Sequence, residues 1–147
     1  MKICRSIAAA GAAVVLGATG AFLAPAAASA HSTTHTLTFT AVLTNQAHFS
    51  ATTAARAEND LNSAGKIIGF DVVYIVFNPK AGTASGTLTL DTSGGVLYGT
   101  LKLTTSPVIH GTVTGGTDAF QGATGTILGN SLNQNDTRTA VTITYTT

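Results

Sequence analysis

The sequence has no tryptophan and only one cysteine and three prolines in 147 residues. Charged residues are also scarce, at 9% of the chain. A single cysteine excludes a disulfide scaffold and a thiolate metal site. The few lysines and arginines are scattered, so the chain lacks the basic surface that binds nucleic acid. We therefore expect a conventional hydrophobic core, no nucleic-acid partner, no metal site and no cofactor.

Common catalytic motifs are missing as well. The chain has no Gly-x-Ser-x-Gly, no Walker sequence, no Gly-x-Gly-x-x-Gly between a strand and a helix, and no His-Glu-x-x-His. The pair Gly115-Gly116 is followed by an expected strand, whereas a phosphate-binding loop leads into a helix. Hydrolase and nucleotide chemistry are therefore disfavoured.

The first 30 residues are typical of a secretory signal peptide. Lys2 and Arg5 precede an apolar stretch over residues 7–23, and the small residues Ala28-Ser29-Ala30 form a cleavage site. We expect a secreted protein that begins at His31. No later segment is long and apolar enough to span a bilayer, so no membrane association is expected after removal of residues 1–30.

Removal of residues 1–30 changes the composition of the chain. Cys4 leaves with the signal, as do two of the seven basic residues, so five remain against six acidic residues, a net charge of −1. The remaining 117 residues (147 minus 30) are enough for one domain with a single core. We expect one domain over residues 31–147.

Period-two alternation predicts an all-β chain. Apolar residues from Leu37 to Leu43 alternate with threonines, which indicates a half-buried strand. Residues 45–63 show weak periodicity and are interpreted as a loop across one end of the fold. Shorter strands are expected over residues 84–90, 96–104, 108–114, 123–132 and 137–145, with hairpin turns between them.

The segment Lys66–Phe77 is the most apolar after residue 30 and predicts a central strand. Both faces of this strand are apolar, so one face needs a cover from another subunit or from a packed layer. Glycines inside the expected strands allow the coiling that closes a sheet. About seven or eight antiparallel strands should therefore form a closed barrel.

The stretch TVTGGTDAFQGATG, from Thr112 to Gly125, is expected to form a glycine-rich corner between two strands. Gly115 and Gly116 suit the positive φ angles of a sharp corner, and Phe120 is expected to pack beneath it. The corner is assigned to Gly115, Gly116, Thr117, Phe120 and Gly125, the last allowing a close approach of another strand.

This corner resembles the allene oxide cyclase and dirigent family of barrels, which carry a Gly-Gly-Thr/Ser-Gly-x-Phe corner. The resemblance continues weakly from Glu58 through the GKIIGF segment. It implies an eight-stranded antiparallel barrel, commonly trimeric, around a largely apolar cavity for a cyclase or isomerase reaction. Asp118 replaces a family glycine, and Thr124 replaces the arginine of dirigent members, so dirigent-type acid–base chemistry is not expected at the corner.

Asp71 is the main candidate for a catalytic group. It lies within the apolar strand, and burial would raise its pKa and make it a general acid or base. The alternative is an outward carboxylate that pairs on the surface. Tyr74 is the second candidate, as a phenol that orients a ligand, with packing as its alternative.

Other side chains are candidates for contact with a ligand. Phe39, Phe70, Tyr98 and His110 are expected to line the cavity, although simple packing or exposure would also account for them. Glu58, Asn59, Asp60 and Asn62 form an oxygen-rich cluster, which lacks the spacing of a calcium loop and is interpreted as a solvated segment.

Three functions remain open from the sequence. The first is a cyclase or isomerase that acts on an apolar molecule by fixing its conformation. The second is a module that binds or carries an apolar small molecule without turnover. The third is a structural secreted protein whose core is filled by its own side chains. A homo-oligomer is expected in each case, and the resemblance implies a trimer.

Overall fold

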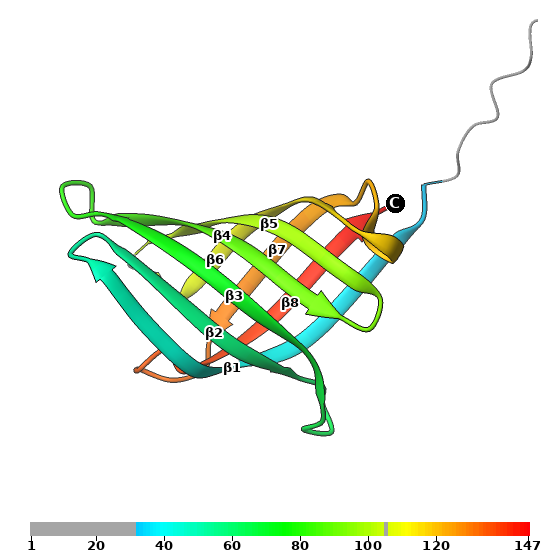
Figure 1. Ribbon diagram of the computed structural model, residues 1–147, viewed down its shortest axis with the longest axis horizontal. Helices are drawn as coiled ribbons and strands as arrows, with labels where there is room; N and C mark the ends of the chain where they lie inside the picture. Colours follow the sequence, from blue (N-terminus) through cyan, green and yellow to red (C-terminus); the bar gives the residue numbers. More distant parts are fainter. Residues whose placement is uncertain (1–31, 105) are drawn as a thin grey trace, which may run out of the picture. The chain divides into compact units, whose positions relative to one another are not determined.

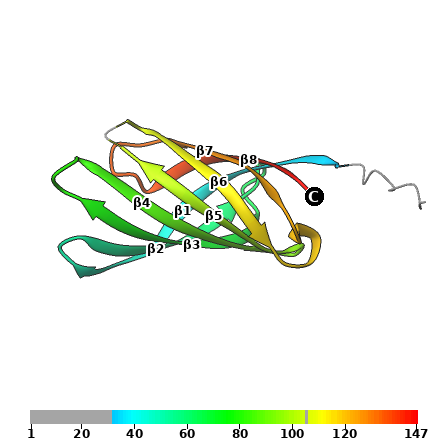
Figure 2. The same cartoon turned by 90° about the horizontal axis from the view of Figure 1, so that it is seen from above.

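The computed structural model describes residues 32–104 and 106–147, which form one closed antiparallel barrel (Figures 1 and 2). Each strand pairs with the next along the chain, and β8 pairs with β1. The strands are β1 (Thr34–Ser50), β2 (Thr53–Leu61), β3 (Ile67–Asn78), β4 (Thr83–Thr92), β5 (Gly95–Leu103), β6 (Val108–Gly116), β7 (Thr124–Ser131) and β8 (Arg138–Thr146). The predicted eight-stranded barrel is confirmed.

Alternation places one face of every strand inside the barrel. The inward side chains form one hydrophobic cluster, which includes Phe39, Val73, Leu88, Leu101 and Ile143. Strand glycines also face inward, where a side chain would collide with its neighbours: a Cβ at Gly99 would lie 2.5 Å from Ile127 Cδ1. The interior is thus filled by a mixture of branched side chains and glycines, as a narrow barrel requires.

The two ends of the barrel differ. The hairpins β1–β2, β3–β4, β5–β6 and β7–β8 meet at one end, which we call the mouth (Figure 1). The opposite end carries the turns β2–β3 and β4–β5 and the long β6–β7 connection, which contains the 3₁₀ turn η1 (Asp118–Phe120). The glycine-rich corner therefore closes the end away from the mouth.

The corner packs largely as the sequence predicts. Phe120 is 3% exposed and makes an edge-on contact with Tyr145, at 5.4 Å between ring centroids. Gly115 has φ +147°, but Gly116 is needed for a different reason, since a Cβ there would lie 2.4 Å from Phe120 Cβ. Thr117 fixes the corner to β5, because its hydroxyl accepts a hydrogen bond from the Val96 amide at 3.1 Å.

Gly125 lies where β7 approaches β8 most closely. A Cβ at this position would lie 2.0 Å from the Thr144 carbonyl oxygen and 2.7 Å from Tyr145 Cα. Because backbone atoms cannot move aside, Gly125→Ala should destabilise the protein by about 3 kcal/mol or more, as judged by urea unfolding. Gly94→Ala is the control, since its Cβ would meet nothing closer than 3.6 Å. Equal stability of the two variants would contradict this packing.

The prediction of a loop over residues 45–63 is wrong. β1 continues to Ser50, and β2 occupies Thr53–Leu61. The pattern of β2 is inverted relative to an ordinary half-buried strand: small alanines lie on its outer face, while charged side chains face the interior. This inversion hides the strand from any search for alternating hydrophobic residues.

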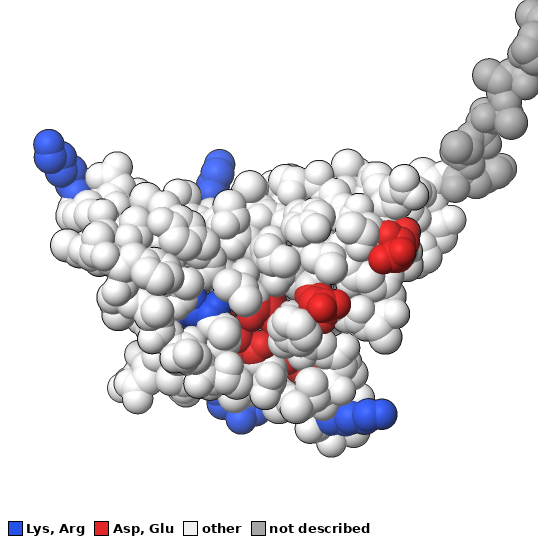
Figure 3. Space-filling view, viewed as in Figure 1, with Lys and Arg blue, Asp and Glu red and all other residues white. Residues whose placement is uncertain are grey.

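Threonines cover much of the outer surface. One row of six lies in register across six neighbouring strands, from β4 through β8 to β1: Thr87, Thr100, Thr112, Thr126, Thr144 and Thr36. β-branched threonine suits a pleated surface and adds hydroxyl groups without charge. Charged side chains are few on the face of the molecule that Figure 3 shows.

The expected signal peptide, with Cys4, lies outside the described residues, as does Thr105. Within the part of the chain that is described, no helix has the length and apolar character needed to cross a membrane. Residues 34–146 are occupied almost entirely by the strands and turns of the barrel.

Candidate functional site

Three charged side chains of β2 point into the barrel. Arg56, Glu58 and Asp60 occupy every second position of β2, so they share the inner face of the strand. Their order runs from the mouth toward the closed end. β2 therefore brings a cation and two carboxylates into an otherwise apolar interior.

Asp71 of β3 completes this group. It is 3% exposed and stands directly opposite Glu58 in the β2–β3 register, while Asp60 stands opposite Gly69. Glu58 is 7% exposed and Asp60 1%. These three carboxyl groups, which we call the acidic cluster, are half of the six acidic residues in the chain. Of the two positions considered for Asp71, the structure has the inward one, and the solvated interpretation of Glu58 and Asp60 is wrong.

Asp60 and Asp71 are incompletely hydrogen-bonded. Both carboxyl oxygens of Asp60, and Oδ1 of Asp71, have no hydrogen-bond partner among the residues that the structure describes. Gly69 stands opposite Asp60, and a Cβ at Gly69 would lie 2.5 Å from the Asp91 carbonyl oxygen. Buried carboxyl oxygens without partners are costly when charged, so protonation is the expected response.

Burial is the main cause of the altered acidity in the cluster. Loss of solvation, with the charges of Glu58 and Asp60 nearby, raises the pKa of Asp71 to about 9. Burial, with the charge of Glu58, raises the pKa of Asp60 to about 7. Burial also raises the pKa of Glu58, although Arg56 opposes that rise. At neutral pH Asp71 is therefore a neutral acid.

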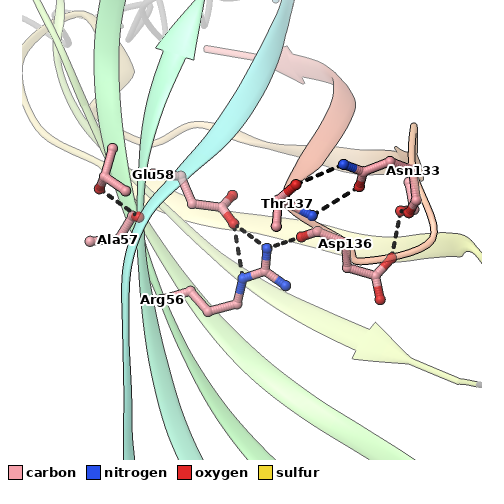
Figure 4. A network of polar contacts seen from close by, with 8 residues as sticks. Arg56, Ala57, Glu58, Asn133, Asp136 and Thr137 are labelled. Carbon is pink, nitrogen blue, oxygen red and sulfur yellow. Dashed lines mark hydrogen bonds and ion pairs between the residues drawn. The ribbon is translucent and has the colours of Figure 1, made fainter.

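Arg56 links the acidic cluster to the mouth. Its guanidinium group forms an ion pair with Glu58 at 2.8 Å, and Nε donates a second hydrogen bond to the same carboxylate at 3.0 Å. The guanidinium also donates to the backbone carbonyl of Asp136 in the β7–β8 turn (Figure 4). Asn133 and Thr137 brace that turn, with the Thr137 amide donating to Asn133 Oδ1 at 2.9 Å.

A small chamber of about 60 Å³ lies next to Glu58 and Asp71 of the acidic cluster. Its wall includes Arg56, Glu58 and Asp71, and its other side chains are mainly apolar, among them Phe39 and Val141. By the space one water molecule needs, this chamber accommodates about four waters, or a small group of a ligand. The site is therefore an apolar chamber with acid groups in its wall.

Two larger hollows lie at the mouth, next to the chamber. Their volumes are about 570 Å³ and 620 Å³, and both share Arg56 and Leu103 with the chamber. The hairpin residues Pro79, Pro107 and Asp136 belong to their rims. The mouth can thus hold the body of a small molecule, while the chamber can hold only a small part of it.

The structure places only some of the predicted site residues in this chamber. Phe39 and Asp71 line it. Tyr74 lies on the outer face of β3 and is 42% exposed, so its expected position in the cavity is corrected. Tyr74 and Asp71 are an odd number of residues apart and therefore point to opposite faces of the strand.

The other three expected cavity residues also lie outside. Phe70 is 54% exposed on β3, Tyr98 is 42% exposed on β5, and His110 is exposed on β6. Phe70 and Tyr98 each lie between two buried residues of their own strands, and His110 lies between two half-buried ones. These three side chains do not contact the chamber, and their expected placement is corrected.

Arg56, Glu58 and Asp60 were not identified as site residues from the sequence. The signal that could have found them is their own period of two, in which charged residues alternate with Ala55, Ala57 and Asn59. Small residues on one face and charged residues on the other are compatible with an inward charged face only when the strand lies in a closed barrel.

Metal binding has no geometric support at this site. Among the described residues, no three or more histidine, cysteine, aspartate or glutamate side chains are arranged to hold a metal ion. The acidic cluster is better suited to binding protons, since the pKa values of Asp60 and Asp71 lie above the ordinary range for aspartate.

The closed eight-stranded barrel has a dirigent-like fold. Neither a family model nor a curated protein matches the sequence. A pterocarpan synthase dirigent protein is similar in structure, with a TM-score of 0.66 and 17% identity over 78% of this chain and 88% of that chain. Pyocyanin demethylase is also similar, with a TM-score of 0.64 and 15% identity over 76% and 99%. The fold implied by the glycine-rich corner is confirmed.

Proposed function

We propose that the barrel binds a largely apolar small molecule and that Asp71 acts on it as a general acid. The observation that carries this proposal is a neutral, buried carboxyl group in the wall of an apolar chamber that shares Arg56 and Leu103 with the hollows at the mouth. A carboxylic acid that stays protonated at pH 7 can donate a hydrogen bond to a ligand oxygen. The ligand is therefore expected to carry a carbonyl or other oxygen acceptor.

The dimensions of the site suggest how such a ligand would lie. The chamber of about 60 Å³ admits the polar reacting group, and the hollows of about 570 Å³ and 620 Å³ hold the apolar body. Apolar walls would restrict the ligand to one folded conformation, which lowers the barrier to an intramolecular reaction. Asp71 would stabilise negative charge that develops on the oxygen.

This arrangement fits a cyclase or isomerase. Such a reaction rearranges bonds within one molecule and requires only that a proton be lent and recovered. The two similar structures are a pterocarpan synthase dirigent protein and a pyocyanin demethylase, and both names denote proteins that act on small organic molecules. They support small-molecule chemistry in a barrel of this kind, and the reaction of this chain is our inference from its own chamber.

A structural role is favoured by one observation. The chamber itself is small because inward side chains such as Leu88, Leu101 and Ile127 fill most of the barrel. In that case the protein would release no bound compound and take up no apolar probe. A carrier without turnover would instead release its ligand chemically unchanged.

Purification of the protein from culture medium provides the first test. We propose that it is secreted and begins at His31, so its intact mass should lack residues 1–30. Native mass spectrometry, followed by extraction, should then identify a bound apolar compound. A protein that is empty and excludes a hydrophobic fluorescent probe would contradict the binding proposal.

Asp71→Asn tests the catalytic step. The amide keeps the shape of the side chain but cannot transfer a proton, so turnover of the identified compound should fall by about 10²–10⁴-fold. In the unaltered protein, kcat should also fall as the pH rises through about 9, where Asp71 loses its proton. Thr89→Ser, a change on the outer face, is the control. Unchanged turnover in Asp71→Asn would eliminate Asp71 as the acid.

A further inference from the structure

β1 extends farther toward the mouth than its neighbour β8. The two strands pair as far as Val42 opposite Arg138, and beyond this pair the Leu43 amide donates to the Thr137 carbonyl at 2.9 Å. Pairing of β1 with β2, in contrast, continues to the end of β1. Figures 1 and 2 accordingly show the β1–β2 hairpin reaching past the β7–β8 turn. We call the boundary between that turn and residues 44–50 the seam.

A β-bulge bends β1 where the seam begins. Leu43 stands opposite Glu58 and Asn45 opposite Ala57, so Thr44 is an extra residue in β1. Its hydroxyl donates to the Ala57 carbonyl at 2.8 Å. A bulge bends its strand and interrupts the regular pairing. The bulge therefore turns β1 away from β8 and supplies a hinge for the residues beyond it.

Arg56 crosses the seam from inside the barrel. It stands opposite Gln46, in the part of β1 that extends beyond β8, and its guanidinium donates to the Asp136 carbonyl of the β7–β8 turn. We call this hydrogen bond the latch (Figure 4). Nε and Nη2 of the same guanidinium hold Glu58. Release of the latch therefore leaves the ion pair in place, and no buried charge loses its partner.

The latch lies on the route from the mouth to the chamber. Arg56 and Asp136 line both hollows, and Arg56 also lines the chamber. With the latch formed, the mouth is divided and the chamber has a volume of only about 60 Å³. A wider entrance requires the β1–β2 hairpin to move away from the β7–β8 turn.

Movement of the hairpin disturbs little packing. Residues 44–50 are all exposed, and the hairpin carries small side chains such as Ala47 and Ala51. Its large side chain, Phe49, stacks on Tyr74 at 6.2 Å between ring centroids, which holds the hairpin to β3 and not to β8. Segments with few buried apolar contacts open locally at a small fraction of the free energy of global unfolding.

We propose that the seam opens to admit the ligand, with Thr44 as the hinge and Arg56 as the latch. This inference rests on the proposed binding of a small molecule. The hairpin moves outward, the latch and the backbone hydrogen bond of Leu43 break, and the two hollows become one. On closure Arg56 regains the Asp136 carbonyl and encloses the ligand with Asp71, away from water.

Amide hydrogen exchange measures the opening without any ligand. The Leu43 amide is protected by a bond across the start of the seam, whereas Ala41 pairs with Thr139 within the barrel. Leu43 should therefore exchange at least about a hundredfold faster than Ala41. Arg56→Lys keeps a cation beside Glu58 but loses the forked donor that reaches the turn. It should accelerate exchange at Leu43 by about tenfold and leave Ala41 unchanged.

Arg138→Lys is the matched control, because Arg138 is exposed at the start of β8. It should leave the exchange of both amides unchanged. Equal rates at Leu43 and Ala41 in the original chain would mean that the seam opens only with global unfolding, which would overturn the proposal. A Leu43 rate that Arg56→Lys does not alter would overturn the assignment of Arg56 as the latch.

Stopped-flow fluorescence with N-phenylnaphthylamine, an uncharged apolar probe, tests passage through the seam. Thr137→Val removes the hydroxyl that accepts a hydrogen bond from Asn133 Nδ2 at 2.7 Å, and so loosens the turn that the latch holds. Thr137 is not among the described residues that line the chamber or the hollows. The association and dissociation rates of the probe should therefore both rise by about threefold, with an unchanged dissociation constant.

Thr142→Val, on the outer face of β8, is the control for the probe experiment and should alter neither rate. Uptake at unchanged rates in Thr137→Val would overturn passage through the seam while leaving the binding proposal intact. Uptake in none of the variants, nor in the original chain, would contradict the binding proposal and passage with it. The two failures are therefore distinguishable.

Discussion

The free energy of unfolding should fall by several kcal/mol as the pH rises from about 5 to about 9. Folding raises the pKa of Asp60 to about 7 and that of Asp71 to about 9, whereas in the unfolded chain both titrate near 3.8. Between these values the folded state holds protons that the unfolded state has released. The stabilisation is therefore complete below pH 4 and is lost as the pH passes through the folded pKa values.

Asparagine substitutions identify the groups responsible. Asp71→Asn removes a carboxyl group that must either hold its proton or carry a buried charge, so it should flatten the pH dependence and stabilise the protein above pH 8 relative to the original chain. Asp60→Asn should act in the same direction at lower pH. Asp91→Asn, on the outer face of β4, should leave the profile unchanged.

Urea unfolding at a series of pH values, followed by circular dichroism, measures this profile. Carboxyl ¹³C shifts in the folded protein would report the two titrations separately. Stability that rises between pH 5 and pH 9 would contradict the protonated state of the cluster, since that sign belongs to carboxylates whose pKa is lowered by folding.

The sequence predicts the architecture because most strands carry an ordinary alternating pattern. From Thr83 onward, the hairpin turns and the apolar alternation place five strands within two residues of their observed ends. The corner residue Phe120 is recognisable because glycines surround a single large aromatic. These features are local, so no knowledge of neighbouring strands is needed to interpret them.

The alternating pattern alone cannot predict which face of β3 points into the barrel. Its two faces are both apolar, so alternation groups Asp71 with Val73 and Tyr74 with Val72 without saying which pair is inside. Space inside the closed barrel decides it: the inner face carries Gly69 and a short aspartate, whereas the outer face carries larger side chains. Such crowding depends on all eight strands and is absent from any one segment.

The acidic cluster escapes prediction for a related reason. Charged residues are seldom buried, so Glu58 and Asp60 suggest solvent when the strand is considered alone. Their burial becomes intelligible only when the β2–β3 register sets Glu58 beside Asp71 and when Arg56 shares the inner face. The site depends on how β2 and β3 pair, whereas the fold follows mainly from the alternating pattern within each strand.

Loss of Arg56 should be the most destabilising change at the mouth. Arg56→Ala leaves the buried Glu58 carboxylate without its ion pair and frees the β7–β8 turn, at a cost of about 2–3 kcal/mol near pH 7. The exposed Arg138→Ala is the matched control, with an expected change within about 0.5 kcal/mol. Amide hydrogen exchange in residues 133–137 should accelerate only in the first variant, because Arg56 contacts the Asp136 carbonyl.

A double-mutant cycle with Glu58→Gln separates the ion pair from the contact with the turn. If the pair matters, the combined variant should be less destabilised than the sum of the two single variants by about 1–2 kcal/mol. The coupling should shrink at acidic pH, where Glu58 becomes protonated and no longer requires a cation. Simple additivity at pH 7 would show that Arg56 acts through the turn alone, and the acidic cluster would then be independent of the mouth.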